Sequence, residues 1–401
     1  MFMFHRILII TAIILTSFLN SCSQHLELIL AESEDIKTGA QNLISSNLDL
    51  ISEKKVGIVA NQASIVHSLH LVDTLLALNI EIVKIFSPEH GFRGKAEAGA
   101  YIQDGMDTKT GLEVISLYGD HKKPTLEDLK GIDVMLFDLQ DVGVRYYTYI
   151  STLSYVMEAC GKYNIPIVVL DRPNPNGFYI DGPVLKPLYS SFVGLHPVPI
   201  VYGMTIGEYA LMVKGEHWQD STSNINLTVI PLKGYSHHML VKLPVKPSPN
   251  LPNWESVYLY PSLCLFEGTS VSVGRGTDFP FQIYGHPDYY TGSYSFTPKS
   301  IRGVSENPKF KGIQCVGQNL NNYAKNFKDN PQKLNLLWLI HSYELLSKHG
   351  DFFNDYFEKL AGTDELQKQI ESGLSEEEIR ESWQLEINKF KEIRKKYLLY
   401  D

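Results

Sequence analysis

The sequence predicts an α/β fold in which helices cover both faces of a parallel sheet. Short runs of β-branched and other apolar residues recur between residues 43 and 170, and segments with helical apolar spacing separate them. Such continuous apolar runs are typical of strands that are buried on both faces. The length of 401 residues exceeds that of one ordinary domain, so a second domain is expected.

Five short apolar runs predict the strands of the sheet. They cover residues 56–60, 81–86, 112–117, 133–137 and 166–170. Helical spacing of apolar residues places helices at residues 69–78, 125–130 and 148–163. Strand and helix therefore alternate, which is the pattern of a parallel sheet with crossover helices.

A proline-rich stretch predicts the domain boundary. A helix over 205–218 and a strand over 227–230 precede it, and residues 243–252 then hold four prolines in ten residues. This gives a first domain over residues 41–245 and a C-terminal domain over residues 246–401. Helices are expected in the C-terminal domain at 333–348, 363–371 and 375–397, the last with a capping box at Ser375 and Glu378.

The N-terminal residues predict export. The charge of Arg6 precedes an apolar run over residues 7–19, which is too short to span a bilayer and fits a secretory signal. Leu19-Asn20-Ser21-Cys22 resembles a bacterial lipobox. We expect a signal peptide over residues 1–21, lipidation of Cys22, a polar tether over 22–40 and a lipid-anchored location in the periplasm or outer membrane. The alternative is a plain signal peptide with a chance Cys.

Composition excludes several functional classes. The hydrophobic content of 44% and the charged content of 20% are those of a globular protein, and a net charge of −9 without a Lys/Arg stripe argues against a nucleic-acid partner. The sequence has no dinucleotide fingerprint, phosphate-binding loop or nucleophile elbow. No C-x-x-C spacing occurs, and His67 and His70 form only a weak metal pattern, so neither a disulfide framework, a metal nor a cofactor is expected.

Polar residues follow four of the five predicted strands, at the point where each strand ends. Ligands of an open parallel sheet bind outside the carboxyl ends of its strands, so these loops predict the functional site. The candidates in them are Asn61, Glu89, His90, Arg93, Asp138, Asp141, Arg145, Tyr147, Asp171 and Arg172.

Glu89 is the leading catalytic candidate. It comes directly after a predicted strand, between Pro88, which stiffens the backbone, and His90-Gly91, which permits a tight turn. A carboxyl group held in such a corner is suited to act as a general acid. The alternative is that Glu89 caps a neighbouring turn or helix.

Asp138, Asp141 and Asp171 are further acids on the same edge of the sheet. Most glycoside hydrolases need two carboxylates about 5 to 10 Å apart, and strands about 4.8 Å apart allow that spacing. Asp171 could instead form a salt bridge with Arg172 or another Arg.

Three arginines and one C-terminal acid complete the candidates. Arg93, Arg145 and Arg275 each lie beside Gly or an aromatic residue, and Arg forms two-point contacts with carboxylates, which suits an acidic sugar. Structural ion pairing is the alternative. Glu267 and Arg275 lie in Gly-rich segments, which indicate either backbone close to a ligand or a system of tight turns. Tyr147 could stack on a sugar ring or belong to the core.

Taken in order, these motifs resemble the NamZ-type exo-β-N-acetylmuramidases, formerly a domain of unknown function. The resemblance extends from about residue 40 to the end of the chain. It rests on Val59-Ala60-Asn61-Gln62, Ser87-Pro88-Glu89-His90-Gly91, the segment from Asp138 to Tyr149, Leu170-Asp171-Arg172-Pro173-Asn174-Pro175, the segment from Tyr202 to Glu208, Ser248-Pro249-Asn250, and the segments from Phe266 to Thr269 and from Gly274 to Thr277.

The resemblance implies a Rossmann-like catalytic domain and a smaller C-terminal α/β domain, with the active site in the cleft between them. It also implies an exo-acting glycoside hydrolase that releases β-linked N-acetylmuramic acid from the non-reducing end of peptidoglycan fragments. Glu89 is then the catalytic residue, and Glu267 is preferred over Asp141 as the second acid, although an acetamido sugar can supply its own nucleophile. The implied substrate-binding residues are Asn61, His90, Arg93, Arg145, Tyr147, Asp171, Arg172, Asn250 and Arg275, with one of the arginines on the lactyl carboxylate.

Two other functions stay open on the sequence alone. A non-catalytic lipoprotein that binds cell-wall sugars would also need the export signal and the aromatic loops. An esterase or amidase acting on another wall bond is the other alternative, and the missing nucleophile elbow argues against it.

Overall fold

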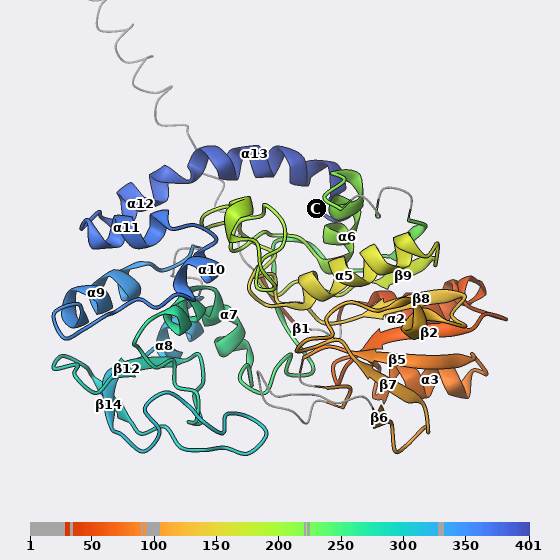
Figure 1. Ribbon diagram of the computed structural model, residues 1–401, viewed down its shortest axis with the longest axis horizontal. Helices are drawn as coiled ribbons and strands as arrows, with labels where there is room; N and C mark the ends of the chain where they lie inside the picture. Colours follow the sequence, from red (N-terminus) through yellow and green to blue (C-terminus); the bar gives the residue numbers. More distant parts are fainter. Residues whose placement is uncertain are drawn as a thin grey trace, which may run out of the picture.

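A seven-stranded sheet forms the centre of the first domain. The computed structural model describes residues 29–32, 35–89, 91–93, 105–219, 222, 225–327 and 333–401. The strand order is β10-β9-β8-β2-β5-β7-β6 (Figure 1), and all neighbours are parallel except the edge pair β6 and β7. The strands are β2 (Val56–Ala60), β5 (Ile82–Ser87), β6 (Gly105–Met106), β7 (Glu113–Ser116), β8 (Val134–Asp138), β9 (Ile167–Leu170) and β10 (Leu227–Ile230).

Helices cover both faces of this sheet, which confirms the predicted fold class. Successive residues of a strand point to opposite faces. In β2, Ile58 packs in the cluster that includes α2 (Gly39–Ser46) and α3 (Leu71–Ala77). Val59 packs instead with α5 (Tyr149–Lys162) and α6 (Ile206–Gly215). Both faces are therefore apolar, which explains the uninterrupted hydrophobic runs.

The C-terminal half has its own small sheet. Its three antiparallel strands have the order β12-β14-β13, with bounds Ile283–His286, Cys315–Asn319 and Tyr294–Phe296. The helices of this half are α7 (Trp254–Leu263), α8 (Asn321–Lys325), α9 (Leu337–Leu346), α10 (Phe357–Ala361), α11 (Glu365–Glu371), α12 (Glu376–Ser382) and α13 (Gln384–Arg394). Shorter elements are α4 (Leu126–Leu129), the hairpin β3 (Ile65–Val66) and β4 (Leu69–His70), and the 3₁₀ turns η2 (Leu48–Leu50), η3 (Pro187–Tyr189), η5 (Cys264–Gly268) and η7 (Lys395–Tyr397).

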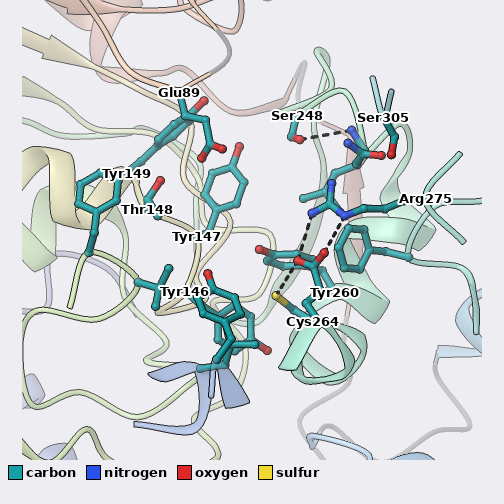
Figure 2. A pocket seen from close by; sticks show the side chains of 18 of the residues that line it. Glu89, Tyr146, Tyr147, Thr148, Tyr149, Ser248, Tyr260, Cys264, Arg275 and Ser305 are labelled. Carbon is teal, nitrogen blue, oxygen red and sulfur yellow. Dashed lines mark hydrogen bonds and ion pairs between the residues drawn. The ribbon is translucent and has the colours of Figure 1, made fainter. Parts of the chain in front are cut away.

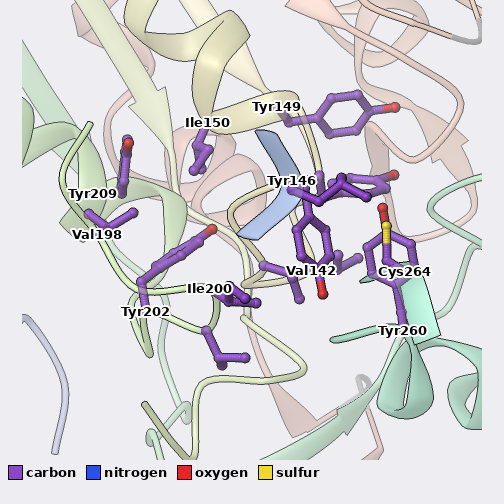
Figure 3. Packing of buried hydrophobic residues seen from close by; sticks show 14 of the residues in the cluster. Val142, Tyr146, Tyr149, Ile150, Val198, Ile200, Tyr202, Tyr209, Tyr260 and Cys264 are labelled. Carbon is purple, nitrogen blue, oxygen red and sulfur yellow. The ribbon is translucent and has the colours of Figure 1, made fainter. Parts of the chain in front are cut away.

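One hydrophobic core joins the two halves. Figure 3 shows Tyr146, from the loop after β8, beside Tyr260 of α7, and their rings meet edge to face with centroids 5.6 Å apart. The Tyr146 hydroxyl donates to the carbonyl of Pro261, inside α7. Packed side chains and a hydrogen bond therefore join the two halves.

The end of the chain returns to the first half. Helix α13 runs across the top of the molecule in Figure 1 and ends beside α6. Arg394 Nε donates to the carbonyl of Gly203 at 2.8 Å, and the Tyr400 hydroxyl donates to Asp171 Oδ2 at 2.6 Å. The last residues of the chain thus stabilise the first domain. The sequence pattern does not reveal these contacts.

Two elements differ from expectation. Strand β1 (Ile29–Glu32) lies within the predicted tether and pairs in parallel with β11 (Met239–Lys242), a partner that is remote in sequence. The helix expected over 375–397 is divided, because the backbone of Trp383 (φ −101°, ψ 0°) separates α12 from α13 and its ring is buried. The capping box at Ser375 and Glu378 is confirmed. Within the described ranges, no helix has the length and apolarity needed to span a membrane.

Candidate active site

A cavity of about 790 Å³ opens where the carboxyl ends of the strands face the C-terminal half. Its volume lies within the range of about 300 to 1,000 Å³ that is usual for small-molecule sites. The first half supplies Glu89 after β5, Tyr118 after β7 and Tyr146 to Tyr149 after β8. The C-terminal half supplies residues from Ser248 onwards. The rule that ligands bind at the carboxyl ends of parallel strands therefore located the cavity correctly.

Glu89 lies on the wall formed by the first half. The turn after β5 brings Pro88 and Gly91 together, since Gly91 N–H donates to the Pro88 carbonyl at 3.1 Å and Gly91 adopts a φ of 76°. Figure 2 shows the Glu89 carboxylate near the rings of Tyr147 and Tyr149. Burial, and to a smaller extent the charge of Glu89, raise the pKa of Tyr149 well above its ordinary value. This tyrosine therefore stays neutral beside the carboxylate.

Asn61 lies behind that wall. It is fully buried, and its Nδ2 donates to the hydroxyl of Tyr149 at 2.8 Å. The hydroxyl of Tyr147 is fixed in turn by the carbonyl of Pro247 at 2.8 Å, and the Tyr147 and Tyr149 rings are 4.8 Å apart. Asn61 thus positions a cavity residue, whereas Tyr147 itself lines the cavity and also packs in the hydrophobic core. Its stacking on a sugar ring stays a prediction.

The opposite wall carries an ion pair. Arg275 Nε and Nη2 donate to the two carboxylate oxygens of Glu267 at 2.6 and 3.1 Å (Figure 2). Phe281 covers the guanidinium, with its ring centroid 4.9 Å from Arg275 Cζ. Burial acts to lower the pKa of Arg275, but the attraction of Glu267 outweighs it and raises that pKa, so the arginine keeps its charge. The sequence candidates Glu267 and Arg275 therefore lie together on the cavity wall.

Asn250 presents an unused acceptor at the same cavity. Its side chain is 1% exposed, and its Nδ2 donates to the carbonyl of Val304 at 2.8 Å. Its Oδ1 has no hydrogen-bond donor among the described residues. Because buried polar atoms usually have a partner, this oxygen is a candidate to accept a hydrogen bond from a ligand.

Several cavity residues are absent from the predicted set. Tyr118, Lys122 and Phe192 form an aromatic and basic edge, with Lys122 Nζ 5.3 Å from the Phe192 ring centroid. Lys309 and Tyr356 come from the C-terminal half. Tyr118 follows β7, so the strand-end rule could have found it, but Lys309 and Tyr356 follow no strand of the large sheet.

Arg145 belongs to the scaffold, which corrects the expectation that it binds substrate. Its side chain is completely buried, and burial lowers the pKa of Arg145 to about 10. Its two Nη atoms donate to four backbone carbonyls at 2.6 to 2.9 Å, those of Pro183, Val198, Leu360 and Ala361. With these contacts it links the first half to α10 and does not reach the cavity.

Asp141 does not line the cavity either, so the structure does not support it as a catalytic acid. Its carboxylate is buried and accepts hydrogen bonds from the Tyr202 hydroxyl and, at 2.6 Å, from Gly143 N–H. Burial raises the pKa of Asp141 to about 7, although these hydrogen bonds act in the opposite direction.

Asp171 and Arg172 also serve the scaffold, and their predicted contact with a sugar is corrected. Asp171 is fully buried and accepts from Thr205 Oγ1 and Gly207 N–H, both at 2.8 Å. Arg172 forms a two-point ion pair with Asp138 at 2.6 and 2.8 Å. The salt bridge with Arg172 that was considered for Asp171 is thus formed by Asp138 instead.

Arg93 is used in an ion-pair network beside the sheet. It donates to Asp107 at 2.8 and 3.1 Å, and Asp73 lies 3.5 Å away. Hydrogen bonding by Arg93 lowers the pKa of Asp107 to about 2. Arg93 therefore forms the structural ion pairs that were considered as its alternative, and its contact with the substrate stays a prediction. His90 and Cys22 lie outside the described residues.

The chemistry available in the cavity is that of carboxylates, tyrosines and cations. Among the residues with described positions, no group of three His, Cys, Asp or Glu side chains is arranged to hold a metal ion. Glu89 on one wall and the Glu267–Arg275 pair on the other are the charged groups that the sequence predicted and the fold brings together. This arrangement suits acid catalysis on a substrate that lies between the walls.

Known proteins and family models match this chain over nearly its whole length. Residues 56–255 match the family "Exo-beta-N-acetylmuramidase NamZ, N-terminal" and residues 258–400 match "Exo-beta-N-acetylmuramidase NamZ, C-terminal". A Bacillus subtilis (strain 168) protein named "Peptidoglycan beta-N-acetylmuramidase NamZ" is 39% identical over an alignment of 389 residues, and the match covers 92% of each chain.

Two crystal structures of DUF1343 family proteins from Bacteroides fragilis NCTC 9343 are also similar. The first is 44% identical with a TM-score of 0.82, and the match covers 91% of this chain and 99% of that one. The second is 28% identical with a TM-score of 0.74, and the match covers 92% of this chain and 99% of that one. The two-domain match and the conserved length show that this chain belongs to the NamZ exo-β-N-acetylmuramidase family.

Proposed function

We propose that this protein hydrolyses β-linked N-acetylmuramic acid from the non-reducing end of peptidoglycan fragments. The observation that carries the proposal is the position of Glu89, which lines the cavity between the two halves at the end of a central strand. The similarity to the Bacillus subtilis peptidoglycan β-N-acetylmuramidase supports the same activity.

Glu89 acts as the general acid in this proposal. It donates a proton to the glycosidic oxygen while the bond from that oxygen to the anomeric carbon breaks, so that the leaving sugar departs as an alcohol. The neutral tyrosines around Glu89 bring no second charge to this wall. Water then completes the hydrolysis at the anomeric carbon.

The second catalytic group is either Glu267 or the substrate itself. Both carboxylate oxygens of Glu267 accept hydrogen bonds from Arg275, at 2.6 and 3.1 Å, which opposes nucleophilic attack by Glu267. The acetamido oxygen of the substrate can attack the anomeric carbon instead. We therefore assign Glu267 to holding Arg275 and to compensating positive charge, with the acetamido group as the nucleophile.

The test compares a natural disaccharide with an activated substrate. With N-acetylmuramyl-β-N-acetylglucosamine, Glu89→Gln should lose roughly 10²- to 10⁴-fold in turnover, the usual contribution of general acid catalysis. With para-nitrophenyl β-N-acetylmuramide the loss should be smaller, because para-nitrophenolate leaves without protonation. Glu127→Gln is the control, since that side chain is 83% exposed and does not line the cavity.

Each other outcome has a definite meaning. Normal turnover of the disaccharide by Glu89→Gln would show that Glu89 is not the acid. A loss in Glu267→Gln as large as that in Glu89→Gln would make Glu267 the second catalytic group. Saturable binding of the disaccharide without product would favour a sugar-binding lipoprotein, and release of peptide or acetate would favour an amidase or esterase.

We also propose that the protein is exported and anchored to the membrane through a lipid on Cys22. The signal-like residues 1–21, the lipobox-like motif and a substrate in the cell wall support this location. Cys22→Ala should move the protein from the detergent phase to the aqueous phase in a Triton X-114 partition. An unchanged partition would contradict lipidation at this residue.

A further inference from the structure

Three cations line the cavity among the described residues, and they differ in how their charge is used. Lys122 lies at the edge, over the ring of Phe192. Arg275 is paired with Glu267, and Lys309 lies on the same wall. Arg93 and Arg145, the other arginines considered for binding the sugar's acid group, are engaged in the scaffold.

The ammonium group of Lys309 is held without a counter-charge. Its Nζ donates to the carbonyls of Thr269 and Val271 at 2.6 and 3.1 Å, which fixes two of its three protons. In the described part of the chain, no carboxylate lies within ion-pair distance of Lys309. Neutral carbonyls orient an ammonium group but leave its charge uncompensated, so one proton and a full positive charge remain for a ligand.

The charges on this wall add up to one net positive charge. Glu267 compensates Arg275, while both act electrostatically on Lys309. The ion pair uses Nε and Nη2 of Arg275, so its Nη1 has no hydrogen bond to a described residue. The wall therefore offers two donors, Lys309 Nζ and Arg275 Nη1, to one anionic group.

We infer that Lys309, with the free Nη1 of Arg275, binds the lactyl carboxylate of N-acetylmuramic acid and so selects this sugar over N-acetylglucosamine. The inference rests on the proposed function, because only that substrate carries the carboxylate. Figure 2 shows Arg275 across the cavity from Glu89. A sugar ring between the two walls can meet Glu89 with its glycosidic oxygen and the cations with its lactyl group.

The test uses three para-nitrophenyl β-glycosides, those of N-acetylmuramic acid, its lactyl amide and N-acetylglucosamine. The lactyl amide keeps the shape of the substituent and removes its charge. Lys309→Met should lower kcat/KM for the muramide on the order of 10- to 100-fold, mainly through KM, as expected for one charged hydrogen bond. Its kcat/KM for the amide and the glucosaminide should stay close to the wild-type values.

Two further variants control for folding and for loss of charge alone. Lys311→Met removes an exposed ammonium group from the same loop as Lys309. The Lys311 ammonium group donates to the Glu306 carbonyl at 3.2 Å and does not line the cavity. This variant should therefore keep the full preference for the muramide over the amide and the glucosaminide. Lys309→Arg should retain most of the preference for the charged substrate. Thermal unfolding of all variants checks that they are folded.

The failures of the two proposals are distinguishable. If the wild type releases nothing from the muramide, the proposed function fails before any variant is made. If the wild type prefers the muramide and Lys309→Met lowers kcat/KM equally for the acid and the amide, or for neither, the inference is overturned. Loss of the preference in Lys122→Met with retention in Lys309→Met would overturn it as well, and would move the anion site to the cavity edge.

Discussion

The buried ion pair between Asp138 and Arg172 gives the sharpest test of how the strand ends are stabilised. Asp138 ends β8 and is completely buried, and Arg172, which follows β9, is 3% exposed. Two hydrogen bonds of 2.6 and 2.8 Å join them. Replacing Asp138 by Asn keeps the shape of the side chain but leaves the guanidinium of Arg172 buried without a counter-charge.

The expected magnitude follows from this burial. Removing one partner of a buried pair costs about 3 to 5 kcal/mol, because the remaining charge cannot return to water. An exposed pair contributes only about 0 to 1 kcal/mol. The matched control is Lys389→Met, which breaks a pair whose side chains are 60% and 52% exposed, and it should change the free energy of unfolding by less than about 1 kcal/mol.

Urea denaturation followed by circular dichroism measures both variants. A double variant, Asp138→Leu with Arg172→Met, should recover much of the loss in Asp138→Asn, because no uncompensated charge remains in the protein interior. A loss below about 1 kcal/mol in Asp138→Asn, equal to that in Lys389→Met, would refute the argument that Arg172 is inaccessible to water.

Two further predictions concern pH and backbone packing. Burial raises the pKa of Asp141 to about 7 from 3.8, so the folded state keeps a proton that the unfolded state releases, and the free energy of unfolding should fall as pH rises from about 4 to about 7. Asp141→Asn should remove this contribution, which is at most about 1.4 kcal/mol per pH unit. Urea midpoints measured between about pH 4 and about pH 7 test this. Identical pH profiles of the wild type and the variant would contradict it. A Cβ at Gly39 would lie 2.3 Å from the backbone nitrogen of Asp171 and 2.4 Å from the Ile230 carbonyl oxygen, so Gly39→Ala should destabilise the protein by about 1 to 3 kcal/mol or more. Gly105→Ala is the control, because none of the described residues has an atom within 4 Å of the new Cβ. Equal melting temperatures for the two variants would show that the contact at Gly39 relaxes freely.

The large sheet and one half of the cavity could be predicted from local patterns. A strand buried on both faces must be apolar throughout, so β2, β8 and β9 are visible in the sequence itself. Because the polypeptide leaves every parallel strand at the same edge, the residue after β5 must lie at that edge, which is why Glu89 was found. A capping box is likewise local, and Ser375 was found for that reason.

Only the tertiary structure decided which charged side chains reach the cavity. Arg145 and Arg275 look alike in sequence, each beside aromatic or Gly residues, yet one is surrounded by backbone carbonyls and the other lies on the cavity wall. Lys309 gives no local signal, because its role depends on carbonyls of the segment after η5, which the fold brings to it from 40 residues away. The sequence determines what each segment can bury, through short-range periodicity and composition. The partner of a buried charge is set by contacts between segments that are distant in the chain, and no local pattern records those contacts.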